Sequence, residues 1–296
     1  YFWWRRDTFR ASDGRRCAVW GRFWQGGNEK VDGNICKIKE NVKTLIHTAA
    51  RVKHYGDYNV FNQINVEGTK NVANFAFENN LRLIDVSSIS VSGNYLVKQD
   101  NRNIEFSENN LYIGQKYMDN VYVYSKFEAE KIVLEYMEKG LTAQIHRIGI
   151  LSGRNKDGKF QENINENAFY NRIKSMIVLG AVSEKMLDQK IEFTPVDVCC
   201  RAIISLSKNV IADNRIFHLF NHNFVEIKDI IETLGKTGIE IDVVSEKEFE
   251  KKIIELSKSD NAQVLFGIIN DLNNPKNSAT TINYNFSVNI KSEYTQ

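Results

Sequence analysis

The chain has 296 residues, of which 42% are hydrophobic and 26% are charged, and its formal net charge is +2. This composition is ordinary for a globular protein, and the length allows one large domain or a domain with a smaller cap. The small net charge gives no reason to expect a nucleic acid or an anionic membrane as partner. Because the sequence has neither an apolar run of 18 residues nor a signal-peptide pattern, we predict a cytoplasmic location. The cysteines form no CxxC pair and the histidines lack ligand spacing, so we predict no metal site.

The first thirty residues differ in composition from the rest. They hold all four tryptophans and six arginines against one lysine, whereas the other 266 residues hold 24 lysines and eight arginines. No period of 2 or 3.6 runs through them. Three explanations remain open: a basic, aromatic arm that binds a partner, a poorly ordered linker, or translation out of frame from a neighbouring segment. We expect residues 1–30 not to be native to the fold, whose pattern resumes near Val31.

Strand and helix patterns then alternate. Three apolar runs predict buried strands, at 43–50, 81–93 and 141–153. Two longer segments between them, 62–80 and 121–140, have the apolar spacing of helices. This alternation predicts an α/β fold with a Rossmann-like, doubly wound parallel sheet, whose ligands bind at the carboxyl ends of the strands.

The second half of the chain has more helical patterns. Helices are predicted at 162–182, 226–238 and 246–259, and they would form a smaller, mostly helical cap over the site. We therefore expect a partial dinucleotide-binding domain at 31–155 and a substrate-binding cap at 156–296. Residues 188–222 are expected to return in part to the main domain.

The stretch VYVYSKFEAEK places Tyr122 and Lys126 one helical turn apart, on the same face. A lysine ammonium favours the phenolate of a nearby tyrosine and so makes the phenol a usable proton donor or acceptor. Ser88, at the end of the preceding predicted strand, could hold a carbonyl oxygen with its hydroxyl. These three residue types suffice to protonate an alkoxide as a hydride arrives at a carbonyl carbon. The bland alternative is a solvated helix face.

Five segments carry a resemblance to a known family. They are IHTAARVKHYGDYNVFNQINVEGTKNV (46–72), VSSISVSGNY (86–95), VYVYSKFEAEKIV (121–133), HRIGILSGR (146–154) and IEFTPVDVCCRAIISLS (191–207). Together they resemble the extended short-chain dehydrogenases/reductases. The phrase TPVD narrows the resemblance to the thioester reductase branch, the terminal reductase domains of non-ribosomal peptide synthetases and carboxylic acid reductases. The resemblance covers roughly residues 31 to 296.

The resemblance implies roles for individual residues. Tyr122 and Lys126 match the catalytic tyrosine and lysine, and the lysine also contacts the nicotinamide ribose. Ser88 matches the residue that orients the substrate carbonyl. The other implied cofactor-binding residues are Thr48, Ala49 and Ala50 in a turn over the cofactor, Asn65 near the sheet end, and Arg147 and Gly149 near the nicotinamide.

The glycine-rich loop that begins this family has no match here. Such a loop follows a strand, and its backbone N–H groups hold the cofactor pyrophosphate. Gly21, Gly26 and Gly27 have no apolar strand before them and no helix after them in the sequence pattern. We therefore predict a chain truncated at both ends, whose sheet lacks its first βαβ portion and which alone binds cofactor poorly.

The resemblance implies NADPH-dependent reductive release of an acyl or peptidyl thioester from a phosphopantetheine-bearing carrier protein, giving an aldehyde and, after a second turnover, an alcohol. The preference for NADPH over NADH rests on the resemblance alone. Two alternatives stay open: a nucleotide-sugar epimerase or dehydratase of the extended family, and a catalytically inactive fragment or binding relative. The cap lacks a basic, glycine-containing stretch suited to a nucleotide diphosphate.

Overall fold

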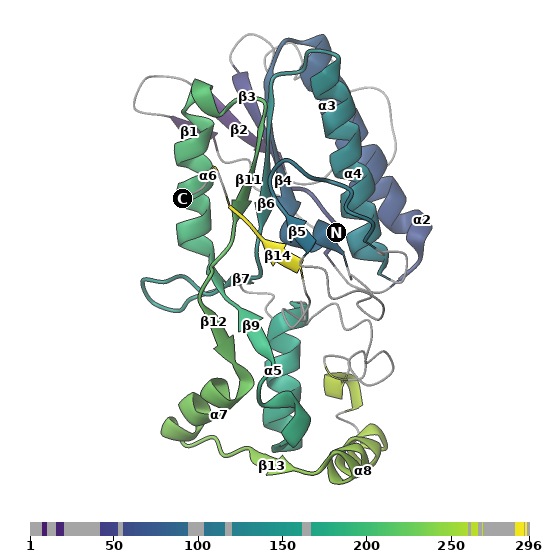
Figure 1. Cartoon of the computed structure of the whole chain (residues 1–296), viewed down its shortest axis with the longest axis vertical. Helices are drawn as coiled ribbons and strands as arrows, with labels where there is room; N and C mark the ends of the chain where they lie inside the picture. The colour runs from purple at the N-terminus through teal and green to yellow at the C-terminus, as the bar shows by residue number, and fades with distance from the viewer. Residues whose placement is uncertain are drawn as a thin grey trace.

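The computed structural model describes residues 8–10, 16–20, 42–52, 56–93, 104–115, 120–161, 167–259, 262–265, 268, 288–292 and 294. Its largest sheet has six strands in the order β1-β2-β3-β4-β6-β11 (Figure 1). Five of them run parallel: β2 (Arg16–Trp20), β3 (Val42–His47), β4 (Arg82–Ser88), β6 (Ala143–Ile148) and β11 (Arg215–Leu219). β1 (Thr8–Arg10) is antiparallel to β2. The predicted Rossmann-like parallel sheet is confirmed.

Helices cover both faces of this sheet (Figure 1). α3 (Gly68–Glu78) and α4 (Val121–Glu138) pack on one face, and α6 (Val196–Ser207) packs on the other. Because side chains alternate along a strand, each strand supplies apolar residues to both layers. Residues that pack with α3 and α4 include Leu45, Leu83 and Ile145. Residues that pack with α6 include Ile46, Ile84 and Phe217.

The N-terminal segment contributes two strands to the sheet. β2 ends at Trp20, directly before Gly21, so the prediction that no strand precedes these glycines is wrong. A five-residue strand that begins with arginine is too short for its period to stand out in the sequence. Residues 21–41, which include Gly26 and Gly27, lie outside the described residues. The missing βαβ portion and the foreign origin of residues 1–30 stay predictions.

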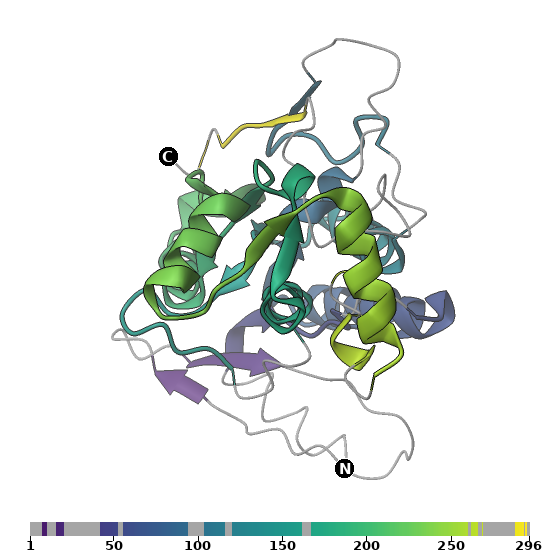
Figure 2. The same ribbon diagram turned by 90° about the horizontal axis from the view of Figure 1, so that it is seen from below.

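The cap has its own apolar core below the main sheet. α5 (Ala168–Leu179) lies between α7 (Ile227–Lys236) and α8 (Glu246–Ser257) (Figures 1 and 2). Two small sheets connect these helices. The first pairs β8 (Ala181–Ser183) with β13 (Asp242–Val244), and the second pairs β9 (Lys190–Glu192) with β12 (Phe224–Glu226). Residues buried in this core include Met176, Val182, Ile227 and Phe249.

Two later segments return to the main domain. The expected return within 188–222 corresponds to α6, which packs on the sheet, and to β11, its last strand. In addition, β14 (Val288–Ile290) pairs with β5 (Ile104–Phe106), which the sequence pattern did not indicate. The short remaining elements are α2 (Tyr58–Phe61), η1 (Asn62–Glu67), η2 (Ile89–Ser92), β7 (Leu151–Ser152), η4 (Glu184–Met186), β10 (Thr194–Pro195), η5 (Val210–Ala212) and η6 (Ala262–Leu265).

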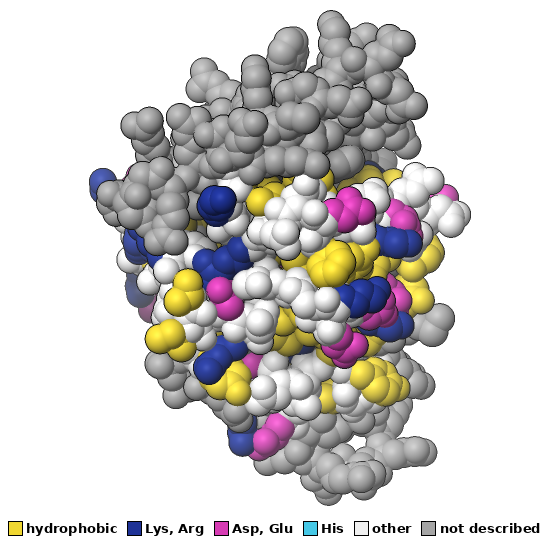
Figure 3. All heavy atoms as spheres, turned by 90° about the horizontal axis from the view of Figure 1, so that it is seen from above, with side chains coloured by type: hydrophobic (Ala, Val, Ile, Leu, Met, Phe, Trp, Pro, Cys, Tyr) yellow, Lys and Arg dark blue, Asp and Glu magenta, His cyan; other side chains and the backbone are white. Residues whose placement is uncertain are grey.

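Within the part of the chain that the structure describes, no helix combines the length and the apolar character needed to cross a bilayer. Seen from above, the described surface mixes basic, acidic and apolar side chains without a continuous patch of one kind (Figure 3).

Candidate active site

Asn120 sets the start of the helix that carries Tyr122 and Lys126. Its Oδ1 accepts hydrogen bonds from the backbone N–H of Tyr122 at 3.1 Å and of Val123 at 3.2 Å. This N-cap satisfies two donors that a first helical turn leaves unpaired. It places Tyr122 in the first turn and Lys126 one turn further along. The second tyrosine of the motif, Tyr124, stacks instead on the ring of Tyr58, with ring centroids 5.0 Å apart.

Lys126 lies against the sheet. It is only 4% exposed, and its Nζ donates to the backbone oxygen of Val86 on β4 at 2.9 Å. Among the described residues this is its one hydrogen bond, and an ammonium has three protons to donate. The alternative of a solvated helix face does not apply at Lys126, because the lysine is buried over the end of β4.

Ser88 and Ser87 have different surroundings at the end of β4. Ser87 is directed to α4, where its Oγ donates to Glu130 Oε2 at 2.7 Å. Ser88 is the last residue of the strand, and its Oγ accepts from the backbone N–H of Ser90 at 3.2 Å and shares a 2.8 Å hydrogen bond with Ser90 Oγ. Ser87 therefore belongs to the buried network of Glu130, whereas the Ser88 hydroxyl bonds to Ser90 at the carboxyl end of β4.

Asn65 links the loop after β3 to α4. It is 1% exposed and lies in the π-helical turn η1, a distortion often found at functional sites. Its Oδ1 accepts from Arg51 N at 2.7 Å, and its Nδ2 donates to Arg51 O at 3.1 Å and to Ser125 Oγ at 2.8 Å. Ser125 is the neighbour of Lys126. Asn65 thus holds the loop that contains Thr48, Ala49 and Ala50 in a fixed relation to Lys126.

Gly149 lies where β6 ends, against a buried carboxylate. A Cβ at this position would collide with the carboxylate of Glu192 and the hydroxyl of Thr194. Glu192 accepts hydrogen bonds from Ile150 N at 2.5 Å, from Asn221 N at 3.0 Å and from the Thr194 hydroxyl. Burial raises the pKa of Glu192. The glycine is required here for close packing, whether or not its backbone also touches a cofactor.

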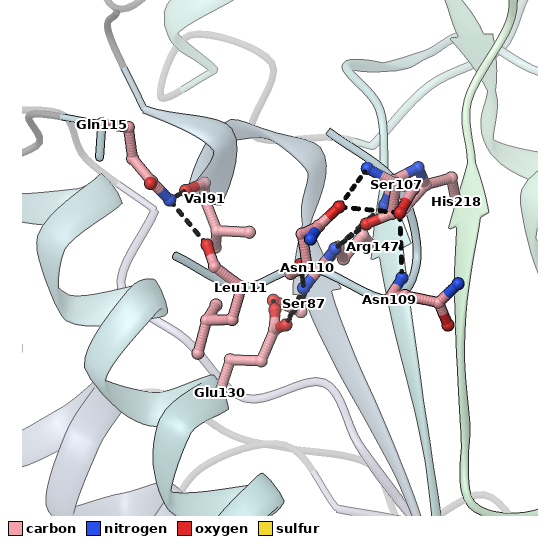
Figure 4. Close-up of polar contacts among 10 residues, drawn as sticks. All are labelled: Ser87, Val91, Ser107, Asn109, Asn110, Leu111, Gln115, Glu130, Arg147 and His218. Carbon is pink, nitrogen blue, oxygen red and sulfur yellow. Dashed lines mark hydrogen bonds and ion pairs between the residues drawn. The ribbon is translucent and has the colours of Figure 1, made fainter. Parts of the chain in front are cut away.

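Arg147 holds a buried network together (Figure 4). It is 0% exposed, and its five N–H donors are all used inside the protein. Nε and Nη2 donate to Glu130 Oε1 at 2.9 and 2.5 Å. The other acceptors are the backbone oxygens of Ser107 at 3.2 Å and Asn110 at 2.6 Å, and His218 Nε2 at 3.0 Å. The side chain of Arg147 therefore organises the sheet end, and the implied cofactor contact of Arg147 stays a prediction.

Two ionisable side chains on neighbouring strands lie beneath Lys126. His47 on β3 and Asp85 on β4 are register partners, 4% and 1% exposed. Burial, and then the charge of Lys126, lower the pKa of His47 to about 3. Burial raises the pKa of Asp85 to about 6, although the charge of Lys126 acts in the opposite direction. The sequence pattern assigned no role to either residue.

A comparison with protein-family models matches residues 32–203 to an NAD-binding family described as "Male sterility protein". The chain belongs to this family. The resemblance to the thioester reductase domains of the extended short-chain family is thereby confirmed.

Members and structural neighbours of this reductase family match most of the chain. The thiolation-reductase di-domain from an archaeal non-ribosomal peptide synthetase is 34% identical, with a TM-score of 0.70, and the match covers 81% of this chain and 51% of that one. Glycine betaine reductase ATRR of Emericella nidulans is 27% identical over 208 residues, 68% of this chain and 15% of the relative. A UDP-glucuronic acid 4-epimerase from Bacillus cereus is 19% identical, with a TM-score of 0.54 over 71% of this chain and 65% of that one, which shows a shared fold alone.

The chain spans about half of the archaeal di-domain and between 4% and 18% of the first curated relatives.

The described residues fit the nicotinamide and ribose half of a dinucleotide. Ala49 and Ala50, just after β3, are small enough to let a cofactor pass closely, and Lys126 has ammonium protons available for hydroxyl groups. Ser88 supplies a hydroxyl at the same edge of the sheet. The segment that would meet the pyrophosphate, 21–41, lies outside the described residues.

Sequence reasoning missed Asn120, Glu130 and Asp85 at this candidate site. Asn120 had a usable signal, because an asparagine before a helical pattern is a preferred N-cap. Glu130 had a weaker one: it follows Lys126 by four residues and so shares the face of Tyr122 and Lys126. Asp85 also had a signal, because it is a charged residue in the middle of a predicted buried strand. Its neighbours come from other elements, so the sequence could not show what surrounds it.

Proposed function

We propose that the protein containing this chain reduces an acyl or peptidyl thioester held by a carrier protein, with NAD(P)H as reductant, and releases an aldehyde. The observation that supports it best is the placement of Lys126 over the end of β4, one turn from Tyr122 and beside the Ser88 strand end, in a chain of this reductase family. The archaeal neighbour, in which a thiolation domain is joined to a reductase, supports a carrier protein as partner.

The chain's own residues would bind the thioester and move one proton. When bound, NAD(P)H supplies the hydride that the carbonyl carbon accepts. Ser88 Oγ and the Tyr122 hydroxyl donate hydrogen bonds to the carbonyl oxygen, on which negative charge develops. As the aldehyde forms, the carbon–sulfur bond breaks, and the sulfur leaves as the carrier's thiol with the proton that the Tyr122 hydroxyl gives up. The oxidised cofactor is left, and a proton from solvent restores Tyr122. Lys126, one helical turn from Tyr122, would hold the ribose of the cofactor with its remaining ammonium protons.

A second turnover on the aldehyde would give an alcohol by the same steps. There the hydride again adds to the carbonyl carbon, and Tyr122 delivers the proton that completes the hydroxyl group. The preference for NADPH over NADH is part of the proposal, and a comparison of kcat/KM with the two cofactors tests it.

The test offers the full gene product two classes of substrate in the presence of NADPH. The first is an acyl group on a phosphopantetheinylated carrier protein, and the second is a UDP-hexose. We expect NADPH oxidation and an aldehyde, trapped as its hydrazone, with the carrier-bound thioester alone. Conversion of the UDP-hexose instead would establish the nucleotide-sugar alternative. A folded product that converts neither substrate would overturn the proposal in favour of an inactive relative.

A further inference from the structure

The carboxylate of Glu192 lies where the cap meets the carboxyl edge of the main sheet. Glu192 is the last residue of β9 in the cap, and its side chain is 0% exposed. It accepts hydrogen bonds from Ile150 N, just after β6, and from Asn221 N, just after β11. A third donor is the hydroxyl of Thr194 on β10. One carboxylate therefore joins the ends of two strands of the main sheet to the cap.

This carboxylate is a buried anion without a cation beside it. Two of its three donors are backbone N–H groups, which can only donate and therefore favour the ionised form. Among the described residues, no lysine, arginine or histidine forms an ion pair with Glu192. A buried charge without a partner of opposite sign is costly. The three hydrogen bonds offset part of that cost, and a cation bound close to Glu192 would offset more.

Gly149 brings the carboxylate against the backbone at the end of β6. A Cβ on Gly149 would collide with the carboxylate of Glu192. Gly149 follows Ile148, which is the register partner of Ser88 on β4. Neighbouring strands of a sheet lie about 4.8 Å apart. The carboxylate therefore lies at the strand next to the one that ends in Ser88, at the same edge of the sheet.

The proposed function brings to this edge a group that becomes positively charged. Ser88 and Tyr122 hold the carbonyl oxygen, and a hydride donor must come within about 3–3.5 Å of the carbonyl carbon. The nicotinamide ring must then lie beside the end of β4, next to the end of β6. The ring is neutral before hydride transfer and cationic after it. An anion nearby therefore stabilises the oxidised ring more than the reduced one.

We propose that Glu192 is the buried counter-charge of the oxidised nicotinamide ring. The inference rests on the proposed function, because that function is what places the ring at this edge. As the hydride leaves, positive charge develops on the ring, and the carboxylate stabilises it without gaining or losing a proton. Glu192 thereby favours hydride donation to the thioester carbonyl. The alternative is a purely structural role, in which Glu192 only joins the strand ends.

The first test measures cofactor binding by the full gene product and needs no thioester. Fluorescence titration gives the Kd of NADPH, and competition gives the Kd of NADP⁺. Glu192→Gln should raise the ratio of the NADP⁺ Kd to the NADPH Kd about tenfold, as expected for loss of one nearby charge at an effective dielectric of about 20. The variant should fold, because the glutamine carbonyl can accept from Ile150 N and its amide N–H can donate to Thr194 Oγ.

Thr194→Val is the matched control. It removes one hydrogen bond of Glu192 and keeps the charge of the carboxylate. Any change in Kd should therefore be equal for the two cofactors, and the ratio should stay at the wild-type value. A purely structural role predicts the same equal change for Glu192→Gln. An unchanged ratio in Glu192→Gln would therefore overturn the inference.

The second test leaves Glu192 in place and applies should Glu192→Gln fail to fold. Its background is Asp85→Asn, which removes the other described carboxyl whose pKa is raised by burial. Burial raises the pKa of Glu192 above its ordinary 4.5, although its three hydrogen bonds act in the opposite direction. Cys199 of α6 also interacts with Glu192, and burial raises the pKa of this thiol to about 12, so it stays neutral below that pH.

Lowering the pH to 4.5 should protonate at least half of Glu192 in the NADPH complex and so remove its charge. The ratio of the NADP⁺ Kd to the NADPH Kd should then rise about two- to tenfold between about pH 8 and this value. Both cofactors carry the same phosphates, so the titration of the phosphates cancels in the ratio. A ratio that stays constant with pH would overturn the inference.

The outcomes separate this inference from the proposed function. A gene product that binds both cofactors and reduces no thioester would refute the proposed function, and the ratio would still show whether Glu192 stabilises the oxidised ring. A gene product that binds neither cofactor would refute the inference as well.

Discussion

The two halves of α4 rest on the same sheet in opposite ways. The C-terminal half is apolar: Val133 packs on Leu83 and Ala143, all of them 0% exposed. The N-terminal half places Lys126 and Glu130, which are also buried, over ionisable residues of β3, β4 and β6. The C-terminal half of α4 therefore fixes the helix on the sheet by burying apolar side chains. The N-terminal half holds ionisable side chains at the strand ends. The two halves should respond differently to substitution.

Arg147→Met should have the largest effect, because it leaves Glu130 as a buried, uncompensated charge. Loss of one partner of a buried ion pair costs about 3–5 kcal/mol in the free energy of unfolding. Urea unfolding measures it. The double variant Arg147→Met/Glu130→Gln should recover part of the loss. Lys131→Met, which removes an exposed i,i+3 contact with Glu128, should cost less than about 1 kcal/mol. Equal costs in Arg147→Met and Lys131→Met would contradict the network.

Leu83→Ala tests the apolar half. Removing a fully buried leucine side chain costs about 2–5 kcal/mol through lost burial and a residual cavity. Because Leu83 packs in the apolar cluster under the C-terminal half of α4, we expect the kcat of the folded protein to stay unchanged. A large drop in kcat at a temperature where the variant is fully folded, as judged by circular dichroism, would mean that the two halves are not separable.

Asp85→Asn should change how stability depends on pH. The folded pKa of Asp85, about 6, exceeds its ordinary 3.8, so this residue lowers stability as pH rises between those values. His47, His146 and His218 act oppositely, because their folded pKa values of about 3 lie below 6.5 and their contribution is lost as pH falls. The net rise of unfolding free energy from pH 4 to pH 6 should be steeper in Asp85→Asn than in wild type. Parallel curves would show that Asp85 titrates normally.

Asn120→Ala should have a small effect on stability, about 1 kcal/mol, through loss of the N-cap of α4. Asn120→Ser, which keeps a capping oxygen, is the matched control and should lose little. Because the cap fixes the first turn, Asn120→Ala should also reduce kcat, whereas Asn120→Ser should not. Identical kcat values for the two variants would show that the N-cap does not position Tyr122.

The sequence predicts the parts of this site that depend on local pattern. The helix that carries Tyr122 and Lys126, and the strand that ends at Ser88, follow from apolar spacing and from the stop at Gly140. The role of Arg147 could not be predicted in this way, because its acceptors come from separate segments that meet only in the folded chain. The same holds for Asp85, whose register partner lies 38 residues earlier, on β3.

The most direct test of the account compares Tyr122→Phe with Tyr124→Phe in the full gene product, since the two tyrosines stand two residues apart in the same helix. Single-turnover reduction of a carrier-bound thioester is measured with saturating NADPH. The account predicts that Tyr122→Phe slows hydride transfer about 10²–10⁴-fold, as expected for loss of a general acid, whereas Tyr124→Phe, which keeps the ring that stacks on Tyr58, reacts at the wild-type rate. Wild-type rates in Tyr122→Phe, or equal losses in both variants, would contradict it.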